Sequence, residues 1–185
     1  MRKNNMVFSI RDMAFTALFA AVLCAVAPFS VAIGPIPLSF ATLVIYLAAG
    51  TLGWKYGVLS VALYIALGAV GLPVFSSFSG GFHKIAGVTG GFIIGYIPLA
   101  LAAGIFAEFP KKTRLLYTLG MVIGTILLYT CGIAWFILQT GSSLGAALLA
   151  CVTPFLIGDA IKIIIACIVA PQLRGALQRL KRPSR

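Results

Sequence analysis

The stretch Ile85-Ala-Gly-Val-Thr-Gly-Gly-Phe-Ile-Ile-Gly-Tyr-Ile-Pro-Leu-Ala-Leu-Ala-Ala-Gly-Ile-Phe-Ala107 runs for 23 residues without a charged side chain. About 20 predominantly apolar residues suffice for a helix to cross a bilayer, so this stretch predicts a membrane-spanning helix. The remaining chain is similar in character, because 61% of its 185 residues are hydrophobic and only 9% are charged. A soluble domain carries roughly 25% charged residues, and a disordered chain is poor in aromatic residues. The composition therefore excludes both classes and predicts a polytopic membrane protein.

Five further apolar runs are separated from this one by charged residues, prolines and glycines. They predict an all-α fold with six transmembrane helices, at about 13–28, 39–53, 58–71, 85–107, 115–138 and 147–170. A Gly/Ser-rich external loop, 75–82, lies between the third and fourth helices. We expect residues 1–185 to form a single integral-membrane domain, with basic cytoplasmic flanks at 1–12 and 172–185.

The positive charges support this topology. The chain has 14 Lys+Arg against 3 Asp+Glu, a formal net charge of +11. With six spans and a cytoplasmic N-terminus, 12 of the 14 fall on the cytoplasmic side, as positive residues should: Arg2, Lys3, Arg11, Lys55, Lys111, Lys112, Arg114, Arg174, Arg179, Lys181, Arg182 and Arg185. Lys84 lies outside and Lys162 lies within a span. These basic residues flank apolar spans, so we expect contact with membrane lipid and no nucleic-acid partner.

The three acidic residues differ in position. Asp12 and Glu108 lie at the edges of predicted spans, whereas Asp159 lies inside the sixth, with Lys162 three positions later on the same helical face. An ionisable residue within a span normally faces the bundle interior or a cavity. Two interpretations remain open: the two charges neutralise each other and fix helix packing, or they offer an acceptor and a cationic donor to a polar ligand group.

Enzyme chemistry has little support in the sequence. The single histidine, His83, has no partner indicated by spacing, and the four cysteines form no C-x-x-C pair. We therefore predict no catalytic residue, no metal and no resident cofactor. A phosphate-binding G-x-x-x-x-G-K-[ST] loop is also missing from the sequence. The chain should therefore not bind ATP by itself, and active transport would need energy from elsewhere.

Two other features suggest contacts. The external loop contains Phe75, Phe78 and Phe82, which are candidate apolar walls of an externally open pocket. In the first predicted helix, Ala17, Ala21 and Ala25 make a stripe of small residues on one side. Such a stripe allows close helix packing in lipid. It either packs against a neighbouring helix of the same chain or docks a partner membrane protein.

Several motifs in this order resemble the BioY family, the biotin-specific substrate-binding (S) subunits of energy-coupling-factor (ECF) transporters. They are Gly34-Pro-Ile-Pro-Leu38, Leu67-Gly-Ala-Val-Gly-Leu-Pro-Val-Phe75, Ser79-Gly-Gly81, Thr89-Gly-Gly91 and Gly158-Asp-Ala-Ile-Lys162. The chain departs from the family where Val88 replaces a common proline, and where 39–41 lacks a common glutamine.

The resemblance implies a subunit in the prokaryotic plasma membrane, with both termini cytoplasmic, that captures biotin outside. It implies release inside the cell with energy from partners, namely a transmembrane coupling subunit and two cytoplasmic ATPases. The implied coupling interface is Ala17, Ala21 and Ala25. The resemblance implies that Asp159 and Lys162 bind the ligand. The full set of predicted substrate-binding residues is Asp159, Lys162, Phe75, Ser79, Gly80, Gly81, Thr89, Gly90 and Gly91. An S subunit for another vitamin, a self-sufficient permease and a membrane scaffold without an internal ligand remain as alternatives.

Overall fold

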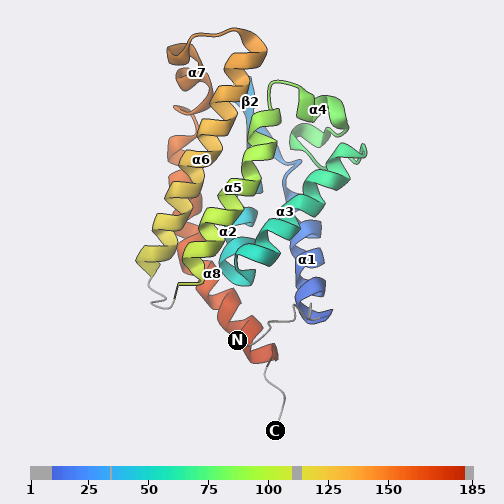
Figure 1. Ribbon diagram of the computed structural model, residues 1–185, viewed down its shortest axis with the longest axis vertical. Helices are drawn as coiled ribbons and strands as arrows, with labels where there is room; N and C mark the ends of the chain where they lie inside the picture. The colour runs from blue at the N-terminus through green and yellow to red at the C-terminus, as the bar shows by residue number, and fades with distance from the viewer. Residues whose placement is uncertain (1–9, 34, 110–113, 182–185) are drawn as a thin grey trace, which may run out of the picture.

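The computed structural model describes residues 10–33, 35–109 and 114–181 (Figure 1). These residues confirm the predicted all-helical class and add one antiparallel hairpin that the sequence analysis did not include. The helices are α1 (Ile10–Val26), α2 (Ala41–Leu52), α3 (Trp54–Ala69), α4 (Phe82–Ala86), α5 (Gly90–Ala107), α6 (Arg114–Thr140), α7 (Leu144–Cys151) and α8 (Leu156–Lys181). The hairpin strands are β1 (Ser30–Ile33) and β2 (Ile36–Ser39), and a 3-10 turn covers Ser76–Phe78.

Helices α1, α2, α3, α5, α6 and α8 overlap the six predicted apolar runs, but they differ in length. By length and composition α5, α6 and α8 are able to cross a membrane, whereas α2 and α3 are shorter apolar helices. The 12 residues of α2 extend over only about 18 Å at 1.5 Å per residue. The hairpin leads directly into α2, which covers most of the predicted second span 39–53.

The expected sixth helix, 147–170, is wrong at both ends. Residue 147 belongs to α7, and α8 begins only at Leu156. Pro154 lies in the turn between these helices, where its missing N–H prevents α7 from continuing. Pro171 was expected to follow the helix but lies inside α8, which continues to Lys181. Part of the predicted basic flank 172–185 is therefore helical.

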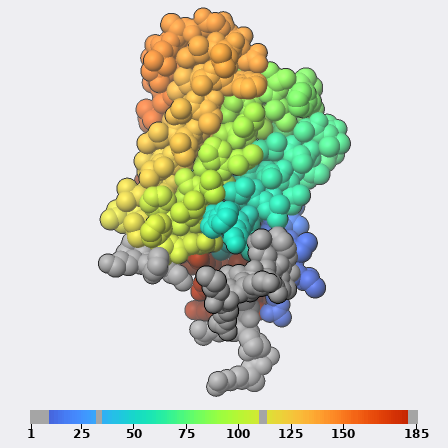
Figure 2. Space-filling view, viewed as in Figure 1, coloured from blue at the N-terminus to red at the C-terminus, as the bar shows by residue number. Residues whose placement is uncertain are grey.

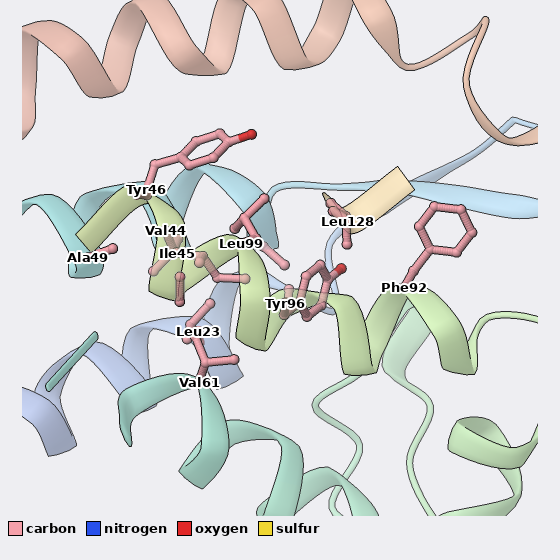
Figure 3. Packing of buried hydrophobic residues seen from close by; sticks show 14 of the residues in the cluster. Leu23, Val44, Ile45, Tyr46, Ala49, Val61, Phe92, Tyr96, Leu99 and Leu128 are labelled. Carbon is pink, nitrogen blue, oxygen red and sulfur yellow. The ribbon is translucent and has the colours of Figure 1, made fainter. Parts of the chain in front are cut away.

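The core is organised around α2. Nine of its residues are buried, and it contacts α1, α3, α5 and α8. Figure 3 shows Val44, Ile45 and Tyr46 of α2 packed with side chains from α1, α3 and α5. Beside this core, α5 and α6 pack closely along their length (Figure 2). Glycines permit this approach, since a Cβ at Gly124 would lie 2.9 Å from the carbonyl oxygen of Leu99.

Most of the described basic residues lie near helix ends at one end of the molecule. The first turns of α1, α3 and α6 and the last turns of α8 lie at one end of the molecule, whereas α4 lies at the other (Figure 1). At the first end the Arg11 guanidinium donates to the carbonyl oxygen of Leu180 over 3.3 Å. Lys84 belongs to α4 and Lys162 to the middle of the bundle. The other half of the predicted cytoplasmic charges, at 2, 3, 111, 112, 182 and 185, lies outside the described residues.

Candidate ligand-binding site

A buried ion pair lies at the start of α8. Asp159 is in the first turn of the helix, where a carboxylate suits the helix dipole, and Lys162 follows one turn later. The Lys162 Nζ lies 2.9 Å from Asp159 Oδ1, and both side chains are only 7% exposed. Asp12 and Glu108 lie at the ends of α1 and α5, so Asp159 is the interior carboxylate of the chain, as predicted.

The ammonium of Lys162 is fully hydrogen-bonded. Besides Asp159, it donates to the carbonyl oxygen of Ser39 over 2.7 Å and to the hydroxyl of Thr42 over 3.0 Å. An ammonium has three donors, and here each has an acceptor. These contacts join α8 to the end of β2 and the beginning of α2, which explains how a positive charge is tolerated in an apolar bundle.

The carboxylate of Asp159 has partners on two other helices. Its Oδ2 accepts a hydrogen bond from the Tyr129 hydroxyl of α6 over 2.6 Å. Its Oδ1 lies 3.4 Å from the Thr42 hydroxyl, which can donate to it while accepting from Lys162. The pair thus belongs to a polar network whose side chains come from α2, α6 and α8.

The hairpin brings its backbone to this network. Ser39 pairs with Ser30 at the open end of the hairpin. The Ser39 hydroxyl donates to the carbonyl oxygen of Ala27 over 2.9 Å and accepts from the N–H of Ala41 over 3.1 Å. It therefore connects the end of α1 to the first turn of α2. Non-helical backbone is tolerated inside a membrane protein where it is buried or lines a cavity, and β2 does both.

A cavity opens beside the ion pair. One end of it is polar, and its walls are apolar and aromatic. Its lining residues are Ile36, Pro37, Leu38, Ser39, Thr42, Phe92, Tyr96, Leu128, Tyr129, Phe155, Asp159 and Lys162. Figure 3 shows Phe92 and Tyr96 on successive turns of α5, with Leu128 of α6 beside them. Such a lining suits a small, mostly apolar ligand with a polar head.

A second cavity continues from the first. The two share Ile36, Pro37, Phe92 and Tyr96 in their linings, so together they make one elongated site. At its far end the second cavity is lined by the partly buried Lys84 of α4. The site therefore has an ion pair at one end, aromatic walls in the middle and a lysine at the other end.

The structure divides the predicted binding residues into two groups. Asp159 and Lys162 line the first cavity, and Phe75 and Thr89 line the second. Phe75 is buried and meets the ring of Tyr64 edge to face at 5.6 Å. The other predicted binding residues line neither cavity: Ser79, Gly80, Gly81, Gly90 and Gly91.

The glycines of this second group have a backbone role instead. A Cβ at Gly80 would collide with the carbonyl oxygen of Leu72, and one at Gly91 with the Trp135 side chain. Gly81 has a φ of +93°, which favours glycine. Phe78 and Phe82, the other candidate walls, are 60% and 72% exposed and line neither cavity.

The sequence analysis missed much of the polar lining. Thr42 and Tyr129 are polar residues within apolar runs. Such a position indicates a side chain that faces the bundle interior or a cavity, so both residues could have been predicted from the sequence. Lys84 lies outside the predicted spans, and that position does not indicate that it lines the site. The hairpin was not foreseen, so the carbonyl oxygen of Ser39 could not be recognised as a partner of Lys162.

The alanine stripe of α1 faces outward. Ala17, Ala21 and Ala25 are all exposed. The opposite face of the helix carries the buried residues Thr16, Ala20 and Leu23, and the Ser60 hydroxyl of α3 donates to the carbonyl oxygen of Thr16 over 3.0 Å. The stripe therefore does not pack against another helix of this chain, which was one of its two interpretations.

Comparison with known proteins gives a consistent result. A model of the BioY family matches residues 1–179. The chain is 34% identical to the biotin transporter BioY of Thermotoga maritima, over 89% of this chain and 96% of that protein. It is 37% identical to a probable biotin transporter BioY of Pyrococcus horikoshii, over 89% and 97%. The fold is similar to a crystal structure of the S-component for biotin from an ECF-type ABC transporter, with a TM-score of 0.81, 26% identity and 95% of each chain covered.

Proposed function

Since the chain belongs to the BioY family, we propose that it is the biotin-binding S subunit of an ECF-type transporter. It is a membrane transporter subunit and not an enzyme. The observation that carries the proposal is the buried Asp159–Lys162 pair, which ends an elongated aromatic cavity. A pair with a purely structural role would not need the open space beside it.

The polar network matches the ureido ring of biotin. This ring has two N–H donors and one carbonyl acceptor. The Asp159 carboxylate accepts from the N–H groups, and the Lys162 ammonium donates to the carbonyl. Because all three donors of Lys162 are occupied in the structure, the ligand carbonyl replaces one of the present acceptors. We assign that place to the Thr42 hydroxyl, the longest of the three contacts at 3.0 Å.

The rest of the site matches the remainder of biotin. The apolar sulfur-containing ring lies against Phe92 and Tyr96, which are shared by both cavities. The aliphatic tail follows the second cavity, and its carboxylate meets Lys84 at the far end. A ligand with a polar head, an apolar middle and a negative end thus finds complementary chemistry along the whole site.

Direct binding tests the proposal. The purified full chain is expected to bind labelled biotin with a Kd below about 1 μM, which corresponds to about 8 kcal/mol. Equilibrium binding measured in detergent gives the value. An excess of riboflavin or thiamine should not displace the label, because neither combines a ureido ring with a carboxylate tail. Absence of biotin binding at micromolar concentration, or displacement by those vitamins, would refute the biotin assignment.

Lys84 allows a sharper test of ligand orientation. Lys84→Gln is expected to weaken biotin binding about tenfold, the value of one hydrogen bond to a charged group. Binding of biotinamide, which has no carboxylate, should change little. The control is Lys55→Gln, which removes a charge at the other end of the molecule, where Lys55 lies over the Trp54 ring. An equal loss for biotin and biotinamide would place the carboxylate elsewhere.

The partners and the membrane orientation complete the proposal. The similarity to an S-component of an ECF-type ABC transporter supports partners that supply the energy for uptake, namely two cytoplasmic ATPases and a transmembrane coupling subunit. The exposed stripe of Ala17, Ala21 and Ala25 is the docking surface for the coupling subunit. The charge distribution favours six crossings with both termini on the cytoplasmic side of a prokaryotic plasma membrane. Biotin then enters from the outside, at the end where α4 lies.

A further inference from the structure

Another cavity lies at the opposite end of the molecule from α4. It occupies the space between the end of α5, the start of α6 and the last turns of α8, with a volume of about 260 Å³. Phe106, Tyr117 and Pro171 give it apolar walls, and Arg114, Arg174 and Gln178 give it a polar rim. It shares no lining residue with the two cavities of the ligand site. The proposed binding of biotin does not involve it.

The two arginines of this rim come from different helices and have no carboxylate partner among the described residues. Within the described residues, 10–33, 35–109 and 114–181, the single side-chain ion pair joins Asp159 and Lys162. Glu108 is near in sequence, but its carboxylate lies against Gly53, in the connection from α2 to α3. The rim is therefore a concentration of positive charge that the described part of the chain does not neutralise.

Both guanidinium groups keep donors for a ligand. Arg174 uses an N–H to donate to the carbonyl oxygen of Ala107 at the end of α5. The hydrogen bonds recorded for Arg114 use only its backbone carbonyl, which accepts from the Thr118 hydroxyl over 2.9 Å. A guanidinium has five N–H donors in a planar fork that matches phosphate oxygens. Two such groups at one rim are suited to bind one phosphate.

The apolar part of the cavity indicates where that phosphate comes from. A free phosphate ion would need only the rim, whereas Phe106 and Pro171 provide a surface for hydrocarbon. The neighbouring side chains of Leu115 and Leu119 on α6 are exposed, so the cavity opens among residues that face lipid. Basic pockets at the ends of transmembrane helices on the cytoplasmic side are suited to anionic lipid headgroups.

We propose that this cavity binds one anionic phospholipid, with its phosphate on Arg114 and Arg174 and an acyl chain against Phe106 and Pro171. This lipid site is separate from the biotin site and does not depend on the proposed function. In the proposed topology it faces the cytoplasmic leaflet. Its occupancy ties together the ends of α5, α6 and α8.

Binding of short-chain lipids to the purified full chain tests the proposal. Dioctanoyl phosphatidylglycerol is expected to bind in a saturable manner, while dioctanoyl phosphatidylcholine and inorganic phosphate bind much more weakly. Arg114→Gln should weaken phosphatidylglycerol binding about fivefold, as expected for removing one cation near an anionic lipid. Arg174→Gln should have a similar effect, and Arg174→Lys should restore part of it because the charge is retained.

Two controls distinguish a specific lipid site from nonspecific electrostatic attraction of anionic lipid to the basic end of the protein. Arg179→Gln removes an exposed charge from the same end of α8 without touching the cavity lining and should leave lipid affinity unchanged. Biotin binding should be the same in all these variants, which shows that they are folded. An equal loss with Arg179→Gln, or equal affinity for phosphatidylcholine, would overturn the site. Binding of inorganic phosphate as tight as that of phosphatidylglycerol would overturn its assignment to a lipid.

Discussion

Asp159→Asn is expected to weaken biotin binding by about 10- to 100-fold, the range for losing hydrogen bonds to a charged acceptor. The substitution keeps the size of the side chain but removes the negative charge opposite Lys162 and the full acceptor capacity facing the ligand. Tyr129 can still donate to the amide oxygen, so the cavity keeps its shape. Equilibrium binding of labelled biotin measures the change.

Lys162→Met should weaken biotin binding to a similar extent and also lower stability. It leaves Asp159 as a buried, uncompensated charge, and breaking a buried pair in this way costs about 3–5 kcal/mol. The double variant Asp159→Asn, Lys162→Met removes both charges. It should regain much of the lost thermal stability but none of the lost biotin affinity.

This contrast separates the two roles of the pair. If it serves only to fix helix packing, affinity should follow the melting temperature, and the double variant should recover both. Tyr46→Phe provides a control for a buried hydroxyl outside the ligand cavity, since Tyr46 bonds the Thr125 hydroxyl at 2.6 Å. It should change stability slightly and affinity not at all. Wild-type affinity in both single variants would return the pair to a structural role.

The fold was largely predictable because helices that lie in lipid require long apolar runs, which are easily recognised in a sequence. Apolar runs identified α5, α6 and α8, the described helices that are long and apolar enough to cross a membrane. Asp12 and Glu108 lie at helix ends, as predicted. Errors arose where a local backbone rule competes with hydropathy. The run at 147–170 is continuous in hydropathy, yet Pro154 divides it, while Pro171 is accommodated inside α8. Hydropathy does not distinguish these two prolines.

The site was predictable only in part, because its geometry depends on distant contacts. Asp159 and Lys162 share one helical face, so spacing alone brought them together. Their partners Ser39, Thr42 and Tyr129 lie 30 to 123 positions away along the chain. Spacing within one helix gives no information on such pairs. The hairpin was missed for a related reason, since its two strands have only four residues each and lie between two strongly apolar runs.

The alanine stripe gives the second large expected effect. Ala21→Trp should reduce copurification of the chain with its coupling subunit and ATPases by about tenfold or more, equivalent to at least 1.4 kcal/mol. Ala21 is the middle residue of an exposed flat strip, and small residues allow the backbones of two membrane helices to approach closely. An indole at this position would hold the partner helix away. Pull-down from coexpressing cells, quantified by the ATPase band, measures the loss.

The stripe also predicts what should remain intact. Because Ala21 lies on the face of α1 opposite the buried Ala20 and Leu23, the tryptophan should not disturb the bundle, and biotin affinity should equal that of the wild type. Ala134→Trp makes the same change at an exposed alanine of α6, on the other side of the bundle (Figure 1). It should spare the complex. Equal loss from both variants would indicate a general effect of surface tryptophan in the membrane, and retention of the complex by Ala21→Trp would mean that the coupling subunit docks elsewhere.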